Sequence, residues 1–242
     1  MGSVRKSREE WKVYGNVFSQ TSLRLLFKLA SQGYFKEIIS PVSMGKEANI
    51  FTAITDDGTH IIVKMYRLEN CNFNKMYDYI IQDNRYLTLK KSKRDTVYAW
   101  VQREYRNLLL ARDHISVPTP LAVKENIILM GFIGKDDPAP KIKDLRPKNP
   151  QKFFDEVIAS VQKLAHAGLV HGDLSEYNIL NDNEKPVFID FSQSTVTQSG
   201  SAAELMRRDI TNVCNFFRKL GVKSDPEQIA ANVMKNVRKQ KE

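Results

Sequence analysis

A segment rich in proline and charge divides this sequence into two halves of different character. Four prolines fall between residues 138 and 150, namely Pro138, Pro140, Pro147 and Pro150. Because proline lacks a backbone N–H and fixes its φ angle, neither a helix nor a central strand continues through such a segment. Short β-like runs precede it and helical patterns follow it. The expected fold class is therefore α+β, with two lobes joined by a hinge.

Apolar periodicity and turn residues predict the elements of each half. In the first half we expect a helix at 21–31, a hairpin with strands at 49–55 and 60–67, a helix at 97–112 and a strand at 125–134. In the second half we expect a helix at 150–165, a hairpin at 177–190, a helix at 202–220 and a last helix from Asp225 onward. The predicted parts are an N-terminal helical extension (1–40), an N-lobe (41–134) and a C-lobe (135–242).

Composition indicates in which compartment the protein is located and what kind of partner it binds. The sequence lacks both an apolar run long enough for a membrane span and an N-terminal apolar segment typical of a secretory signal. Its two cysteines, Cys71 and Cys214, are too few for a disulfide framework, so we expect a cytoplasmic protein. The net charge of +9 favours a polyanionic partner, and a solvated basic surface is the alternative.

Two charged residues fall on faces that are otherwise apolar. Strand alternation places Lys64 on the same face as Ile62. Helical spacing places Glu104 on one stripe with Trp100 and Leu108. Because an unpaired buried charge is costly, we predict that Lys64 and Glu104 form an ion pair. For Lys64 alone, the alternative is an edge-strand lysine whose ammonium extends to water.

Besides Lys64 and Glu104, a group of three polar residues lies in the second half of the sequence. The segment Val170–Leu180, VHGDLSEYNIL, carries Asp173 and Asn178, and Asp190 ends the apolar run VFID. Turns commonly use Asp and Asn in this way. The alternative is phosphoryl transfer, in which Asn178 and Asp190 supply oxygen ligands for Mg²⁺ and Asp173 handles the proton of the attacking group. The occurrence of all three after Lys64 and Glu104 favours phosphoryl transfer.

The order of these motifs resembles the protein-kinase signature set. It differs in having a single glycine in the phosphate loop, His-Gly-Asp for His-Arg-Asp and Asp-Phe-Ser for Asp-Phe-Gly. The segments SMGKEANIF, HGDLSEYNIL and IDFSQS, together with LMGFIG and RRDITNVCNFF, are similar to the RIO family of atypical serine/threonine kinases, in particular its Rio type 1 subfamily. The resemblance extends from about residue 17 to residue 217.

The resemblance implies a two-lobed protein-kinase-like fold with a reduced C-terminal lobe. It also implies ATP and Mg²⁺ as cofactors, with Mn²⁺ as an alternative metal. The implied ATP-binding residues are Ser43, Met44, Gly45, Lys46, Glu47, Ala48, Asn49, Lys64, Gly131 and Ile133. Adenine would be held by the backbone carbonyl of Gly131 and the amide of Ile133, so the family's usual Glu at 131 is not required.

The resemblance also assigns chemical roles by position. Asp173 is the implied catalytic base, and Asn178 and Asp190 are the implied metal ligands. Asp190 is in addition a candidate phosphate acceptor in an ATPase cycle. Glu104 and Asp209 have supporting roles, Glu104 on Lys64 and Asp209 on the loop that carries Asp173.

The implied function is an ATP- and Mg²⁺-dependent serine/threonine kinase or ATPase that phosphorylates itself and acts in small ribosomal subunit maturation. Its partners would be the subunit precursor or its rRNA, and a protein substrate that the sequence does not name. Only 52 residues follow Asp190 (242 minus 190), and the Ala-Pro-Glu motif is missing, so we expect no ordinary peptide-presenting platform. Two alternatives remain: a small-molecule phosphotransferase, since aminoglycoside and choline kinases have similar loops, and a ribosome-binding scaffold with a vestigial nucleotide site.

Basic residues gather at a few places. We predict a mobile loop at Asp83–Thr96, where Ser92 between two lysines is the candidate site of self-phosphorylation. The clustered basic residues are Lys90, Lys91, Lys93, Arg94, Arg207, Arg208, Lys235, Arg238, Lys239 and Lys241. Such clustering favours an RNA-containing partner bound through its phosphates.

Overall fold

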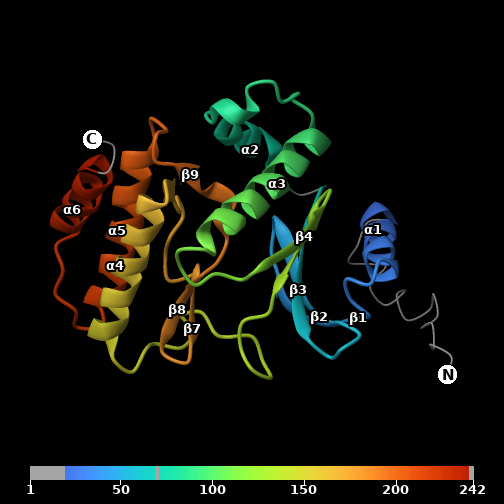
Figure 1. Cartoon of the computed structure of the whole chain (residues 1–242), viewed down its shortest axis with the longest axis horizontal. Coiled ribbons are helices and arrows are strands. Elements are labelled where there is room, and N and C mark those ends of the chain that lie inside the picture. Colours follow the sequence, from blue (N-terminus) through green and yellow to red (C-terminus); the bar gives the residue numbers. More distant parts are fainter. Residues whose placement is uncertain (1–19, 69–70, 240–242) are drawn as a thin grey trace.

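The computed structural model describes residues 20–68 and 71–239, which form two lobes (Figure 1). The N-lobe is built on a five-stranded antiparallel sheet with the strand order β1-β2-β3-β5-β4. The C-lobe contains three helices and two small two-stranded sheets. This arrangement is the α+β, two-lobed fold that the sequence predicts.

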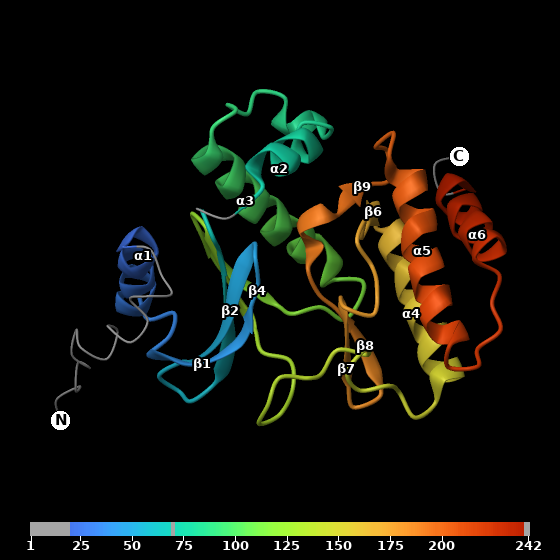
Figure 2. The same cartoon turned by 180° about the vertical axis from the view of Figure 1, so that it is seen from behind.

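The elements of the N-lobe are α1 (Gln20–Ser31), β1 (Glu37–Met44), β2 (Ala48–Ile54), β3 (His60–Tyr66), α2 (Phe73–Ile80), the 3₁₀ helix η2 (Asn84–Tyr86), α3 (Lys93–Ala111), β4 (Pro120–Lys124) and β5 (Ile127–Gly131). Those of the C-lobe are α4 (Pro150–His166), β6 (Leu169–Val170), β7 (Ile179–Asp182), β8 (Lys185–Phe188), the 3₁₀ helix η3 (Phe191–Gln193), β9 (Thr195–Val196), α5 (Ala202–Arg218) and α6 (Pro226–Lys239). Seen from behind, α4, α5 and α6 lie side by side (Figure 2).

The sheet of the N-lobe separates two apolar cores. Helix α1 covers one face and α3 lies toward the other (Figures 1 and 2). Alternation along β3 divides its side chains between them, because successive residues of a strand point to opposite faces. Val63 joins the core under α1, whereas Tyr66 joins the core with α3. Lys64 therefore lies on the α3 side, as the alternation predicts.

Apart from the two-residue strands β6 and β9 and the two 3₁₀ helices, three elements were not predicted from the sequence: β1, α2 and β4. Strand β1 lies at the edge of the sheet, is exposed over most of its length and contains Pro41. Its pairing with β2 is interrupted by two register shifts. Proline and exposure are tolerated at a sheet edge, and they remove the alternation by which a strand is recognised. Because β1 begins at Glu37, the sheet begins inside the range 1–40 that was assigned to the N-terminal extension.

Helix α3 begins at Lys93, four residues before the predicted start. Ser92 is its N-cap, and the Ser92 hydroxyl accepts a hydrogen bond from the amide of Asp95. The predicted loop at Asp83–Thr96 is therefore wrong for residues 84–86 and 93–96, which are helical. Asp83 is buried and binds the guanidinium of Arg85 through both carboxylate oxygens, which holds the start of this segment.

Within residues 20–68 and 71–239, every helix is too short or too polar to cross a bilayer. Of the predicted basic tail, Lys235 is exposed on α6. Arg238 and Lys239 lie at the end of α6, where side chains are not described, and Lys241 lies outside the described residues.

Candidate active site

A cavity of about 610 Å³ lies between the two lobes. Its lining includes apolar residues of the sheet, such as Ile62 and Met130, and the hinge residues Gly131 and Ile133. It also includes five polar residues that the sequence singles out: Ser43, Lys64, Glu104, Asn178 and Asp190. A cavity that combines an apolar wall with a few converging charged groups is the usual form of a small-molecule site.

Lys64 joins two carboxylates from different parts of the chain. Its Nζ lies 2.7 Å from Oε1 of Glu104 and 3.1 Å from Oδ1 of Asp190. The predicted ion pair between Lys64 and Glu104 is thus present. Desolvation disfavours the ammonium, but the charges of Asp190 and Glu104 outweigh it and raise the pKa of Lys64 well above its usual value. Lys64 therefore stays positively charged, which its predicted role in phosphate binding requires.

Tyr66 completes the environment of Glu104, and the sequence reasoning did not assign it a role. Its hydroxyl donates a hydrogen bond of 2.6 Å to Oε2 of Glu104, so that both oxygens of this buried carboxylate have a donor. The signal was available, because Tyr66 follows Lys64 by two residues and shares its face of β3.

Asp190 is held in an unusual backbone conformation. Its φ of 64° and ψ of 70° lie in the left-handed region, which non-glycine residues rarely occupy and which is found at functional sites. The Ser192 hydroxyl donates to Oδ1, the same oxygen that contacts Lys64. Desolvation opposes ionisation of Asp190, but the charge of Lys64 and the hydrogen bond from Ser192 prevail and lower the pKa to about 2. Asp190 is therefore a carboxylate at neutral pH.

The loop between β6 and β7, residues 171–178, carries the second group of predicted site residues; we call it the catalytic loop. The amide Nδ2 of Asn178 donates to the backbone carbonyl of Asp173 at 2.8 Å and to its Oδ2 at 3.2 Å. Burial and the charge of Asp190 raise the pKa of Asp173, while Arg208 and Asn178 oppose the rise. A raised pKa suits a carboxylate that accepts a proton.

His171 anchors the start of the catalytic loop as a neutral imidazole. Its Nε2 donates to the carbonyl of Ile189 at 3.0 Å, and its Nδ1 accepts from the amide of Asp173 at 3.3 Å. These two bonds require one protonated and one unprotonated ring nitrogen. Burial, which outweighs the hydrogen bond to Ile189 and the charge of Asp190, lowers the pKa of His171 to about 4.

Asp209 on α5 holds the catalytic loop through backbone amides. Its carboxylate accepts from the amide of Gly172 at 2.7 Å and from that of Leu174 at 2.9 Å. Burial raises its pKa to about 7, against the effect of these two hydrogen bonds. Arg208, the next residue toward the N-terminus, donates to the carbonyl of Gly172. Arg208 is thus part of the loop's support and not only of a basic surface.

The predicted phosphate loop is placed less directly at the cavity. Ser43 lines the cavity, whereas residues 44–49 are not among its described lining residues. Ser43 and Met44 belong to β1, and Ala48 and Asn49 belong to β2. The turn between them is closed by a hydrogen bond from the amide of Gly45 to the carbonyl of Ala48. A Cβ at Gly45 would lie 2.9 Å from that carbonyl oxygen, which explains why this position is a glycine.

Strand β1 contributes three further lining residues that the sequence reasoning missed: Ser40, Pro41 and Val42.

The residues present fit a magnesium ion. Asn178 uses only its Nδ2 in hydrogen bonds and Asp190 only its Oδ1, so that Asn178 Oδ1 and Asp190 Oδ2 have no hydrogen-bond partner among the described residues. One amide oxygen and one carboxylate oxygen are the few protein ligands that Mg²⁺ takes when phosphates and water complete its octahedron. In residues 20–68 and 71–239, no cluster of three or more His, Cys, Asp or Glu side chains forms another metal site.

Comparison with known proteins agrees with this geometry. Residues 49–229 match the family model of the RIO domain. The RIO-type serine/threonine-protein kinase Rio1 of Methanocaldococcus jannaschii is 43% identical over 217 residues, which are 89% of this chain and 74% of that protein. The Rio1 protein of Haloferax volcanii is 37% identical over 93% of this chain and 78% of its own length. The human serine/threonine-protein kinase RIO1 is 32% identical over 90% of this chain and 39% of its own length.

Solved structures show the same fold. The Rio2 kinase of Chaetomium thermophilum superposes with a TM-score of 0.71 at 23% identity, covering 90% of this chain and 69% of that one. Its complex with ADP/Mg²⁺ and phosphoaspartate gives a TM-score of 0.65 at 22% identity, covering 85% of this chain and 64% of that one. The two-lobed fold is thus that of a kinase, and the chain belongs to the RIO family.

Proposed function

We propose that this protein is an ATP- and Mg²⁺-dependent serine/threonine kinase with ATPase activity, which phosphorylates itself and acts on the small ribosomal subunit precursor. One observation carries the enzymatic part: Lys64, held by Glu104, contacts Asp190 in a cavity that also reaches the hinge at Gly131 and Ile133. The residues proposed to bind phosphate and metal thereby line the same cavity as the apolar wall formed by Ile62 and Met130.

The residues divide the work between binding and chemistry. The hinge backbone would hold adenine, and Lys64 would bind the phosphates. Asn178 and Asp190 would hold Mg²⁺, which when bound neutralises the charge that develops on the phosphoryl group. Asp173 would accept or orient the proton of the attacking hydroxyl, since it lies beside Asn178 and its pKa is raised.

ATPase activity would follow a different route from the same site. A carboxylate oxygen of Asp190 attacks the γ-phosphorus, the bond to the β-phosphate oxygen breaks, and ADP leaves. Water then hydrolyses the aspartyl phosphate to inorganic phosphate and restores Asp190. The Chaetomium thermophilum Rio2 structure is described as a phosphoaspartate complex, and we extend that chemistry to this chain as a proposal.

The experiment is incubation of the purified chain with γ-labelled ATP and Mg²⁺. The proposal expects labelled protein and released phosphate, both lost in D190N. Hydroxylamine-labile label would support an aspartyl phosphate, and acid-stable label on Ser92 would support self-phosphorylation there. The Ser92 hydroxyl now donates to Asp95, so transfer to it requires this hydrogen bond to break. If the chain bound small-subunit rRNA regardless of nucleotide and showed neither labelling nor ATP hydrolysis, the scaffold alternative would be favoured instead.

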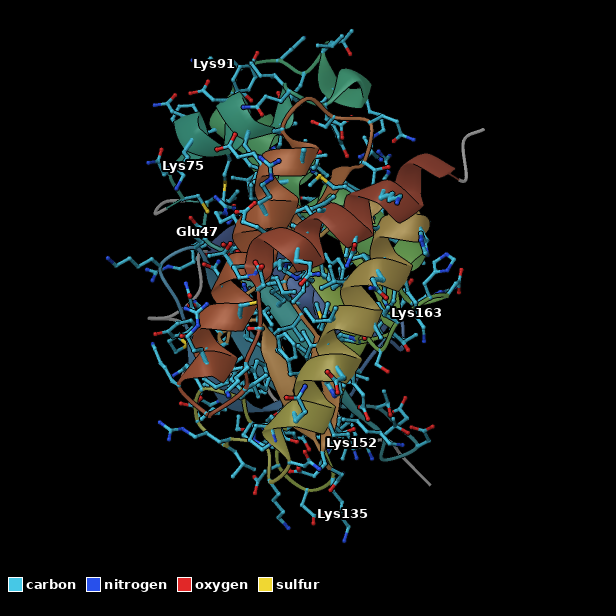
Figure 3. The ribbon with its side chains drawn as sticks, turned by 90° about the vertical axis from the view of Figure 1, so that its left-hand side faces the viewer. Glu47, Lys75, Lys91, Lys135, Lys152 and Lys163 are labelled. Carbon is cyan, nitrogen blue, oxygen red and sulfur yellow. The ribbon has the colours of Figure 1, made fainter. Side chains whose placement is uncertain are left out.

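The partner is proposed from the distribution of charge. Lys75, Lys90, Lys91, Lys93 and Arg94 are exposed around α2 and the start of α3; we call these five residues the α2–α3 basic surface. Lys75 and Lys91 lie at the same end of the molecule (Figure 3). Such a surface suits phosphate contacts with rRNA, without base reading. Both cysteines are buried thiols, in keeping with a proposed cytoplasmic location.

A further inference from the structure

The backbone that follows Asp190 is held by side chains from the N-lobe. We call residues 190–194 the metal loop. The hydroxyl of Tyr79 on α2 donates to the carbonyl of Gln193 at 2.6 Å. From α3, the side-chain Nδ2 of Asn107 donates to the backbone carbonyls of Phe191 and Ser194 at 3.0 and 3.1 Å. Three carbonyls of a five-residue loop are therefore fixed from outside.

A buried guanidinium strengthens this attachment. Arg103 on α3 is 1% exposed and donates through Nε and Nη2 to the carbonyl of Ser194, at 3.2 and 2.8 Å. Its guanidinium carbon lies 5.0 Å from the centre of the Tyr79 ring. Its hydrogen-bond acceptor is a neutral carbonyl, and burial lowers the pKa of Arg103 even though the charge of Asp83 opposes this effect. Burial of this cation is therefore costly, so the arrangement is not explained by stability alone. Because Glu104 is the next residue, one turn of α3 fixes both Lys64 and the metal loop.

The catalytic loop meets the metal loop at the same point. A Cβ at Gly172 would lie 2.6 Å from the carbonyl oxygen of Gln193 and 3.2 Å from the hydroxyl of Tyr79, and Gly172 has a φ of +79°. The space beside Gly172 is thus already taken by the hydrogen bond between Tyr79 and Gln193. Ser194 adds a bond from its hydroxyl to the carbonyl of His171 at 2.9 Å.

We propose that Tyr79 is a positioning residue for the metal: its hydroxyl, with Arg103 and Asn107, keeps the metal loop in the conformation that presents Asp190. In protein kinases generally, phosphorylation of an activation loop orders the equivalent region. In this chain, side chains of α2 and α3 order the metal loop without phosphorylation. Gly172, which has no side chain, leaves room for the hydrogen bond between Tyr79 and Gln193. The inference rests on the proposed function, because it concerns the Mg²⁺ site of that function.

The test compares two phenylalanine variants of the same helix. Y79F removes only the hydroxyl that reaches Gln193 and keeps the ring beside Arg103. Y77F removes a hydroxyl that lies 3.4 Å from the carbonyl of Leu89 and does not reach the metal loop, so it is the matched control. ADP binding is measured by calorimetry at increasing Mg²⁺ concentration and with the metal chelated. D190N and the double variant Y79F/D190N are measured alongside.

The proposal expects Y79F to raise the Mg²⁺ concentration for half-maximal ADP binding by about three- to tenfold, the effect of removing one hydrogen bond. Metal-free ADP affinity should not change, Y77F should match the wild type, and Y79F should have no added effect on D190N. Equal Mg²⁺ dependence in Y79F and Y77F would overturn the inference. So would loss of the fold in Y79F, because the hydroxyl would then serve only the stability of α2. If the wild type itself bound no Mg²⁺–ADP, the proposed function would fail instead.

Discussion

Lys64 and Asp190 lie 126 positions apart in the sequence, yet Nζ of one is 3.1 Å from Oδ1 of the other. The contact joins the central strand of the N-lobe to the metal loop of the C-lobe. It brings the lysine proposed to bind phosphate next to the carboxylate proposed to bind metal. The contact between the two lobes is thus present in the protein alone, and the proposed binding of nucleotide need not create it.

Removing either member of this pair should weaken Mg²⁺–ATP binding. D190N removes a charged metal ligand, and K64A removes the cation that meets the phosphates. Each change eliminates charge-assisted interactions, so we expect a loss of about ten- to a hundredfold in affinity by calorimetry. K152A, which removes an exposed lysine of α4, is the control. Wild-type affinity in both folded site variants would contradict the assigned site.

Replacing Asp173 should separate chemistry from binding. D173A removes the proposed base but leaves Lys64 and Asp190 in place, so nucleotide affinity should stay near that of the wild type. Phosphoryl transfer should fall by roughly 10²- to 10⁴-fold, the contribution of a positioned base. D155A on α4 controls for loss of an exposed carboxylate. Full transfer activity in D173A would remove Asp173 from the mechanism.

Two tyrosine–glutamate hydrogen bonds, one buried and one partly exposed, allow the effect of burial on the stability of the protein to be measured. Tyr66 donates to buried Glu104, and Tyr98 donates to partly exposed Glu125, both at 2.6 Å. Y66F leaves a buried carboxylate oxygen without a donor, so the free energy of unfolding should fall by about 1–3 kcal/mol in urea denaturation. Water can replace the missing partner in Y98F, so its effect should be below about 1 kcal/mol. A larger loss in Y98F than in Y66F would refute the assigned environment of Glu104.

His171 should make the fold less stable as the solution is acidified. Its pKa is about 4 in the folded protein, against an ordinary value of 6.5. Between these two pH values the unfolded state binds a proton that the folded state does not, so stability falls as pH falls from 6.5 toward 4. The free energy of unfolding of the wild type relative to H171Q should therefore shrink by about 3 kcal/mol over this range.

The control for this pH dependence is H166Q, at the exposed end of α4. Denaturant titrations of the three proteins at several pH values give the comparison. Lys64 and Asp190 act on His171 with opposite signs, so neither is altered in this series. A difference between the wild type and H171Q that does not vary from pH 6.5 to 4 would show that the pKa of His171 is not lowered in the folded protein.

The proposed partner predicts a steep dependence on salt. Reversing the charge of Lys90, Lys91, Lys93 and Arg94 should flatten the plot of log affinity for small-subunit rRNA against log salt, by about 0.7–0.9 for each phosphate that the protein no longer neutralises. ATP affinity should not change, because none of the four lines the cavity. Reversal of four exposed lysines elsewhere, at 135, 148, 152 and 163, is the matched control; three of them are labelled in Figure 3. Equal slopes for both sets would show that only net charge matters.

The elements predicted from the sequence are those with strong local signals. The hairpin of β2 and β3 and the helices α3, α4 and α5 have apolar residues at regular spacing, and their turns and caps are marked by Gly, Asn and Pro. The pairing of Lys64 with Glu104 followed from the same periodicity, because each charge fell on an apolar face. Strand β1 and helix α2 were missed, since an exposed edge strand and an eight-residue helix carry little periodicity.

The sequence by itself determined the α+β class and singled out Lys64, Glu104, Asn178 and Asp190, which line the cavity, because period, charge and residue type are local properties. Only the tertiary structure decided which atoms touch: the hydroxyl of Tyr79 reaches the carbonyl of Gln193 across 114 positions. Asp209, whose support of the catalytic loop the family resemblance already implied, binds the backbone amide of Gly172 across 37 positions. These bonds end on backbone carbonyls and amides, which every residue possesses, so no residue type marks them in advance. Their partners were chosen by how α2, α3 and α5 pack against the loops.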